Sequence, residues 1–284
     1  MAVTTAARQP RIERAFLRAC EMDVAVRKPG NVSDASPGHG MTAAMFRSSA
    51  IAAAPALLQP GARLGERVEA AVTASWAAVH CNTNLGILLL CAPLAMAAES
   101  LPVAPGLGAL RRAVRQVLAG LDAADAAAVY RAIAAANPGG LGSVREQDVR
   151  QPPSTGLVAA MALAADRDLV ARQYRDGFAD VWDTGLPAVP AGLPPDHPSA
   201  VEAVFLAWLS AYPDSHIVRK HGAAVAQTVM QAAQGWRLRH DTGVHADWDA
   251  WDRSLKTARI NPGTSADFTV ATLMAAMLLH PLAP

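Results

Sequence analysis

Alanine- and leucine-rich blocks with helical spacing, separated by clusters of glycine and proline, dominate the chain. Alternating runs of β-branched residues, which are typical of half-buried strands, are almost absent. The short segment VAVRK (24–28) is the one candidate strand. Hydrophobic residues make up 52% of the chain and charged residues 17%, so a large core can form. The pattern predicts an all-α fold, with a tail over 1–11 and a single helical domain over 12–284.

The glycine and proline clusters divide the chain into expected helices. The segment 182–198, WDTGLPAVPAGLPPDHP, contains too much proline and glycine for regular structure and is expected to be a surface connector. Asp166 and Asp168 belong to a predicted long helix and are interpreted as part of its solvated face. The expected helices cover 12–26, 42–58, 64–80, 85–98, 107–119, 123–136, 156–182, 199–211, 217–238, 248–258 and 265–280.

Bulk properties argue against several classes of partner. The net charge of +1 and the pI of about 7.8 give no basis for binding nucleic acid or an anionic membrane. The most apolar run, 85–98, is shorter than the roughly 20 residues of a membrane span and contains Pro93, so it predicts a buried helix. Three cysteines without a CxxC pair, and no secretory signal, predict a cytoplasmic protein with free thiols.

Polar residues concentrate in five breaks between the expected helices. Each break is a turn or helix cap when taken singly: Asn82, Thr83 and Asn84 precede one apolar helix. Asp214 and Ser215 precede another, and Thr264 and Ser265 precede the last. The five loops are KPGNVSDASPGHGM (28–41), HCNTNLG (80–86), NPGGLGSVREQDV (137–149), YPDSHIVRKHG (212–222) and NPGTSADF (261–268).

Taken together, these loops suggest a site for phosphates. Glycine-rich entries into helices expose backbone N–H groups at the positive end of the helix dipole. Lys28, Arg219 and Lys220 could add cationic contacts. The loop carboxylates Asp148, Asp214 and Asp267 suit Mg²⁺ shared with a polyphosphate. Neither a P-loop nor a Rossmann glycine motif is present.

Three histidines in these loops, His39, His216 and His221, are candidates for proton transfer. A structural role is an equal alternative for His39 and a stronger one for the other two. Metal-ligand spacing typical of zinc is not evident in the sequence.

The five loops, in this order, resemble the triphosphoribosyl-dephospho-CoA synthases, which make the prosthetic-group precursor of citrate lyase and malonate decarboxylase. The resemblance extends from about residue 16 to residue 279. Lys28-Pro29-Gly30 resembles the family's Pro-Lys-Pro-Gly loop. The other matching segments are Gly38-His39 with Met41, Asn82-Thr83 with Gly86, Gln147-Asp148-Val149, Asp214 with Arg219 and Gly222, and Pro262-Gly263 with Ala266-Asp267.

This resemblance implies an all-helical enzyme that uses ATP, with Mg²⁺, and 3′-dephospho-CoA. The 2′-hydroxyl of dephospho-CoA would attack C1′ of the ATP ribose and release adenine. The expected catalytic residues are His39, Asp148 and Asp214, and the expected metal ligands are Asp148, Asp214 and Asp267. The expected substrate-binding residues are Lys28, Gly30, Asn31, Asn82, Thr83, Asn84, Gly86, Ser215, His216, Arg219, Lys220, Thr264 and Ser265.

The sequence departs from the family pattern at several positions and leaves alternatives open. Asn84 and Leu85 stand where the classical enzymes have His-Lys, Arg27 replaces the first proline, and the Asp before Met41 is missing. The loops look closer to a divergent branch found in archaea and in bacteria with tetrahydromethanopterin-type chemistry. One alternative is therefore a related enzyme acting on another phosphorylated metabolite in coenzyme biosynthesis, of the tetrahydromethanopterin or methanofuran type. A second is a non-catalytic helical scaffold with scattered loops. Whether the chain forms a homodimer stays open.

Overall fold

The computed structural model describes residues 5–136, 151, 153–240 and 247–281. Within these residues the secondary structure is helical and contains no strand, which confirms the all-α prediction. The segment 24–28, suggested as a strand, is instead the end of the first helix and the turn after it.

The helices follow the glycine and proline punctuation of the sequence. In the described residues they are α1 (Thr5–Ala25), α2 (Ala43–Leu57), α3 (Leu64–Val79), α4 (Leu85–Glu99), α5 (Leu107–Ala119), α6 (Ala123–Ala136), α7 (Leu157–Ala162), α8 (Leu169–Asp176), a π-helical turn η1 (Val181–Gly185), a 3₁₀ turn η2 (Leu186–Ala188), α9 (Pro198–Ala211), α10 (Ser215–His221), α11 (Ala223–His240), α12 (Trp248–Thr257) and α13 (Gly263–Leu279).

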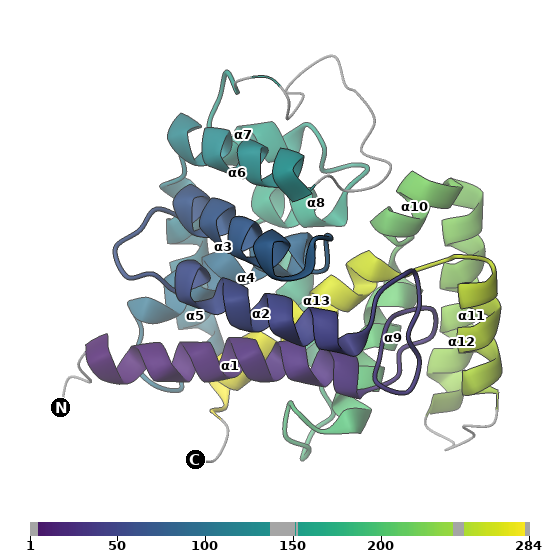
Figure 1. The fold of residues 1–284 in the computed structure, drawn as a ribbon. Helices are drawn as coiled ribbons and strands as arrows, with labels where there is room; N and C mark the ends of the chain where they lie inside the picture. Colours follow the sequence, from purple (N-terminus) through teal and green to yellow (C-terminus); the bar gives the residue numbers. More distant parts are fainter. Residues whose placement is uncertain (1–4, 137–150, 152, 241–246, 282–284) are drawn as a thin grey trace.

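Two almost fully buried helices, α4 and α13, form the centre of the fold. Helix α13 packs against α1, α4 and α9, while α1, α2, α3 and α6 lie one above the other (Figure 1). Nearly every side chain of α4 is buried, including Leu88, Cys91 and Leu94. The prediction of a buried helix over 85–98 is therefore confirmed. None of the described helices is long and apolar enough to span a bilayer.

A second, smaller hydrophobic cluster joins α9, α11 and α12. Its aromatic part consists of Trp236, Trp248 and Trp251, whose ring centroids lie 5.5–5.8 Å apart. The indole N–H of Trp248 donates to the backbone oxygen of Arg27 at 3.2 Å. This bond attaches α12 to the loop between α1 and α2, and Figure 1 shows that loop beside α12.

Two predicted helices are wrong because local signals end them early. The expected helix 156–182 is divided into α7, α8 and η1: Asp168 caps α8 by accepting from two backbone amides, and Gly177 ends it with a φ of 65°. The expected helix 217–238 is divided at Gly222, with a φ of 88°. Helix α1 also begins at Thr5, inside the segment expected to be a tail.

The connector over 182–198 only partly fits its prediction. It contains the π and 3₁₀ turns η1 and η2 before the chain becomes irregular. Trp182 and Gly185 in η1 are buried, so this part of the connector belongs to the core.

Candidate functional site

A cavity of about 450 Å³ brings together four of the five loops singled out in the sequence. The third loop, 137–149, lies outside the described residues, and Asp148 lies there with it. Ten of the expected site residues line this cavity: Asn31, His39, Asn82, Thr83, Gly86, His216, Arg219, Lys220, Thr264 and Asp267.

Three carboxylates, Asp23, Asp168 and Asp267, line the cavity. No hydrogen bond or ion pair involves the Asp267 carboxylate within the described part of the chain. Burial raises the pKa of Asp267 well above its usual range, and the nearby charges of Asp23 and Asp214 raise it further. A side chain at Gly86 would overlap the Asp267 carboxylate, so only glycine leaves room for it.

Arg219 is the cavity-lining cation that contacts Asp168, one of the three carboxylates. Its Nη1 lies 2.8 Å from Oδ2 of Asp168, while its Nε is buried without a hydrogen-bond partner. Two further cavity-lining atoms, Nε2 of His216 and Oδ1 of Asn31, are also buried without partners. Buried polar atoms are normally hydrogen-bonded, so three orphans around one cavity indicate that a ligand supplies the missing partners.

His39 lies at the tip of a tight turn that projects it into the cavity. His39 and Gly40 both have positive φ angles, 56° and 76°, as in a type I′ turn, and Gly38 and Met41 exchange two backbone hydrogen bonds around them. Nε2 of His39 is 2.8 Å from the carbonyl oxygen of Gly30. Since a carbonyl only accepts, Nε2 carries the proton, and Nδ1 of the neutral ring is free to accept one. Burial lowers the pKa of His39, which keeps the ring neutral near pH 7.

His216 is also neutral in this environment. Burial, followed by the charges of Lys220 and Arg219, lowers its pKa to about 3. Its backbone N–H donates to Asp214 Oδ1 at 2.9 Å and to Thr264 Oγ1 at 3.1 Å, which ties α10 to α13. The ring can therefore bind a ligand as a neutral partner, whereas Lys220, exposed at the rim, supplies positive charge.

Lys28 and Asp214, which were expected to face the substrate, lie behind the cavity wall. Lys28 is fully buried, with Nζ 3.0 Å from Oδ1 of Asp23 and a further bond to the Asp23 carbonyl. Asp214 accepts from the amides of His216 and Ile217 and from both the amide and the hydroxyl of Ser265. These bonds occupy both carboxylate oxygens, which leaves Asp214 a structural role at this junction.

Other expected binding residues also point away from the cavity. Ser215 Oγ accepts from the amide of Leu169, and Asn84 Nδ2 donates to Ser75 Oγ at 3.0 Å. Gly30 and Ser265 likewise do not line the cavity. His221, which is partly buried, hydrogen-bonds the carbonyl of Arg259 and is also absent from the wall.

Several cavity residues were not predicted. Asp168 was interpreted as a surface residue, although its position as a helix cap beside Arg219 places it in the wall. Asp23, between the buried Met22 and Val24, carries only the weak signal of an acid within an apolar helix stretch. The apolar part of the lining comes from helices, which gave no functional signal: Phe46, Leu85, Leu89, Tyr130, Ile133 and Met161.

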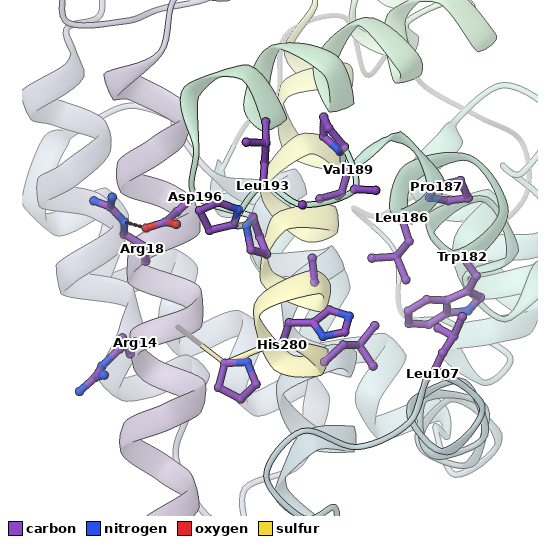
Figure 2. A pocket seen from close by; sticks show the side chains of 18 residues that line it. Arg14, Arg18, Leu107, Trp182, Leu186, Pro187, Val189, Leu193, Asp196 and His280 are labelled. Carbon is purple, nitrogen blue, oxygen red and sulfur yellow. Dashed lines mark hydrogen bonds and ion pairs between the residues drawn. The ribbon is translucent and has the colours of Figure 1, made fainter. Parts of the chain in front are cut away.

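A larger groove of about 1050 Å³ lies elsewhere, between α1, the connector after η1 and the C-terminal end of α13 (Figure 2). Its walls are mostly apolar, and its charged pair, Arg18 and Asp196, is joined at 2.9 Å. It contains none of the residues expected to bind substrate. The smaller cavity is therefore the candidate active site.

Comparisons with known proteins identify the family of the chain. The family model for ATP:dephospho-CoA triphosphoribosyl transferase (CitG) matches residues 9–283. A solved structure from Archaeoglobus fulgidus, described as a "putative triphosphoribosyl-dephospho-coA synthase", is 25% identical with a TM-score of 0.65, covering 82% of this chain and 98% of that one. No curated protein matches the chain. The match over nearly the whole sequence shows that the chain belongs to the ATP:dephospho-CoA triphosphoribosyl transferase family.

Proposed function

We propose that this protein transfers the 5-triphosphoribosyl group of ATP to the 2′-hydroxyl of 3′-dephospho-CoA. The observation that carries the proposal is the convergence of four separate loops on one cavity lined by polar and apolar side chains, in a member of a transferase family. In a non-catalytic scaffold, where these loops would be only turns and helix caps, the loops would not need to lie together. The cavity also contains the buried, unpartnered polar atoms of Asn31, His216 and Arg219.

The polar and apolar side chains of the cavity suit the two parts of a nucleoside triphosphate. Arg219 and Lys220 would contact the triphosphate, together with the neutral groups of Asn31 and His216. The adenine ring would pack against the apolar wall that includes Phe46. The triphosphate is transferred intact, so these contacts have to hold it rather than cleave it.

The proposed step is a displacement at C1′ of the ATP ribose. The C1′–N9 bond breaks with its electron pair going to adenine, the acceptor O2′ bonds to C1′, and the O2′ proton passes to Nδ1 of His39. A proton then neutralises the departing adenine. Because C1′ gains positive charge in such a transition state, a carboxylate beside it is stabilising, and Asp267 is the candidate.

The carboxylates of the cavity also fit Mg²⁺. Magnesium is commonly held by one or two carboxylates together with substrate phosphates. Asp267, without a hydrogen-bond partner in the described residues, and Asp23 would provide those carboxylates. The described side chains contain no group of three potential metal ligands. The metal would offset the negative charge of the triphosphate.

The direct test is release of adenine from ATP, Mg²⁺ and 3′-dephospho-CoA, followed by chromatography. We expect acceptor-dependent adenine release that falls about 10²-fold in Arg219→Ala, since removing one preorganised electrostatic contact has that order of effect. Arg253→Ala, an exposed change on α12, serves as the control. Absence of adenine from folded protein that still binds ATP would exclude this reaction.

A second candidate keeps the same donor chemistry but uses a different acceptor. Leu85 lines the cavity, while the Asn84 side chain is directed to Ser75 in a buried network. These two positions therefore offer no cation for an anionic acceptor. If ATP binds and adenine is released only with another acceptor, this candidate replaces the first.

A further inference from the structure

Asp252 of α12 holds the loop that carries His39 at two points. Its Oδ1 accepts from the amide of Gly30 at 2.8 Å, and its Oδ2 accepts from the hydroxyl of Ser36. Lys256, one turn later, pairs with Asp252 at 3.0 Å and donates to the Ser36 carbonyl at 2.7 Å. Asp252 is only 1% exposed and lies outside the cavity wall.

The same loop residue connects Asp252 to the candidate base. Gly30 donates its amide to Asp252 and accepts from Nε2 of His39 through its carbonyl. The φ of Gly30 is +79°, and a Cβ there would lie 2.9–3.0 Å from atoms of Pro262, Ile260 and Leu255. Gly30 is thus a fixed backbone point between a buried carboxylate and an imidazole.

We propose that Asp252 is a positioning residue that, through the backbone of Gly30, fixes the orientation and the Nε2-protonated tautomer of His39. Its contribution is to aim the free Nδ1 of His39 into the cavity. The part concerning catalysis rests on the function proposed above, but the part concerning the imidazole does not. Lys256 balances the Asp252 charge and fixes the other end of the loop at Ser36.

The kinetic test compares Asp252→Ala with Arg253→Ala, an exposed residue on the same helix. We expect kcat to fall about 10²-fold in Asp252→Ala, the cost of misplacing a reacting group by about 1 Å. The KM for ATP should change much less than kcat, because the cationic phosphate contacts, Arg219 and Lys220, belong to α10 and not to this loop. In a His39→Ala background, Asp252→Ala should have little further effect, since both changes remove the same contribution.

A spectroscopic test needs no substrate. The Nε2–H proton of His39, bonded to Gly30, should appear in a ¹⁵N-edited NMR spectrum and be identified by its loss in His39→Ala. We expect it to disappear through rapid exchange in Asp252→Ala and to persist in Arg253→Ala. If Asp252→Ala fails to fold because Lys256 is left unpaired, Asp252→Ala/Lys256→Met removes that charge, with Lys256→Met as its reference.

Two results would overturn the proposal. One is an equal loss of kcat from Asp252→Ala with and without His39, and the other is a His39 Nε2–H signal that persists without Asp252. If the wild-type protein releases no adenine at all, the proposed function fails, and the NMR measurement alone decides the role of Asp252.

Discussion

Asp267 is the side chain for which function and stability make opposite demands. Burial is the main reason that the pKa of Asp267 is higher in the folded protein than in the unfolded chain. The carboxyl group therefore stabilises the fold fully below its unfolded pKa of about 3.9. This contribution is lost as the pH rises through the folded-state pKa. At pH 7 the protein therefore keeps an acid that resists ionisation. We expect Asp267→Asn to raise the melting temperature at pH 7 in EDTA and to abolish adenine release.

The pH dependence of the melting temperature distinguishes loss of the ionisable Asp267 carboxyl from a general gain in stability. The gain in melting temperature should shrink towards about pH 4, where the wild-type carboxyl is itself neutral. Asp166→Asn is the matched control, because the Asp166 side chain is 96% exposed and belongs to a surface pair with Arg175. A gain that is independent of pH would show that ionisation of Asp267 is not its cause.

Sequence patterns located most cavity-lining loops but not the direction of individual side chains. Lys28 and Asp214 follow the same turn and cap patterns as residues that do line the cavity. Their direction depends on distant partners: Asp214 bonds Ser265 of α13, and Lys28 packs against Asp23 of α1. Asp23 itself had no motif to reveal it. Local spacing contains no information about such contacts between distant parts of the chain.

Among the helices, the close approach of α3 to α6 makes a sharp prediction. A Cβ at Gly65 would lie 2.7 Å from the backbone of Asp125, and the Gly65 amide donates to Asp125 at 3.0 Å. We expect Gly65→Ala to lower the free energy of unfolding by about 1–3 kcal/mol, the usual cost of overpacking. Urea denaturation measures this change.

Gly235 provides the matched comparison in α11. A Cβ there meets no atom within 4 Å, so the change adds helix propensity without a clash. We expect Gly235→Ala to raise the free energy of unfolding by about 0.5–1 kcal/mol. Equal effects of the same sign at the two positions would contradict the close packing of α3 on α6.

Helix prediction succeeded where the glycine and proline breaks agreed with the helical spacing of the apolar residues. The expected 123–136 coincides with α6, and 42–58 differs from α2 by one residue at each end. It failed at 156–182 because the apolar spacing continues past Asp168 and Gly177, which end helices through hydrogen bonding and backbone conformation. For the same reason Asp168 was not predicted as a site residue, because an acidic residue in the middle of a helix is usually on its solvated face.

The cavity is lined by residues of the main hydrophobic cluster, such as Leu89 and Met161. The loop carrying Asn31 and His39, which also line the cavity, is attached to α12, whose Trp248 and Leu255 belong to the second cluster. A ligand that contacts both sets of lining residues therefore adds a connection between the two clusters.

This arrangement predicts that substrate binding protects a helix it does not touch. Adding ATP with Mg²⁺ should slow hydrogen exchange in α12 for those amides that exchange through local opening. The reason is that ligand contacts to Asn31 and Asn261 would hold the loop that is bonded to α12 and the segment that follows α12. Helix α5, which contributes nothing to the cavity wall, should show no local change. Mass spectrometry of deuterium uptake measures both.

If hydrogen exchange slows equally in α5 and α12, the ligand stabilises the fold only globally. If exchange in α12 does not respond, the loop and α12 are not coupled to the cavity. The expected difference between the two helices follows from the hydrogen bonds of one buried carboxylate, Asp252.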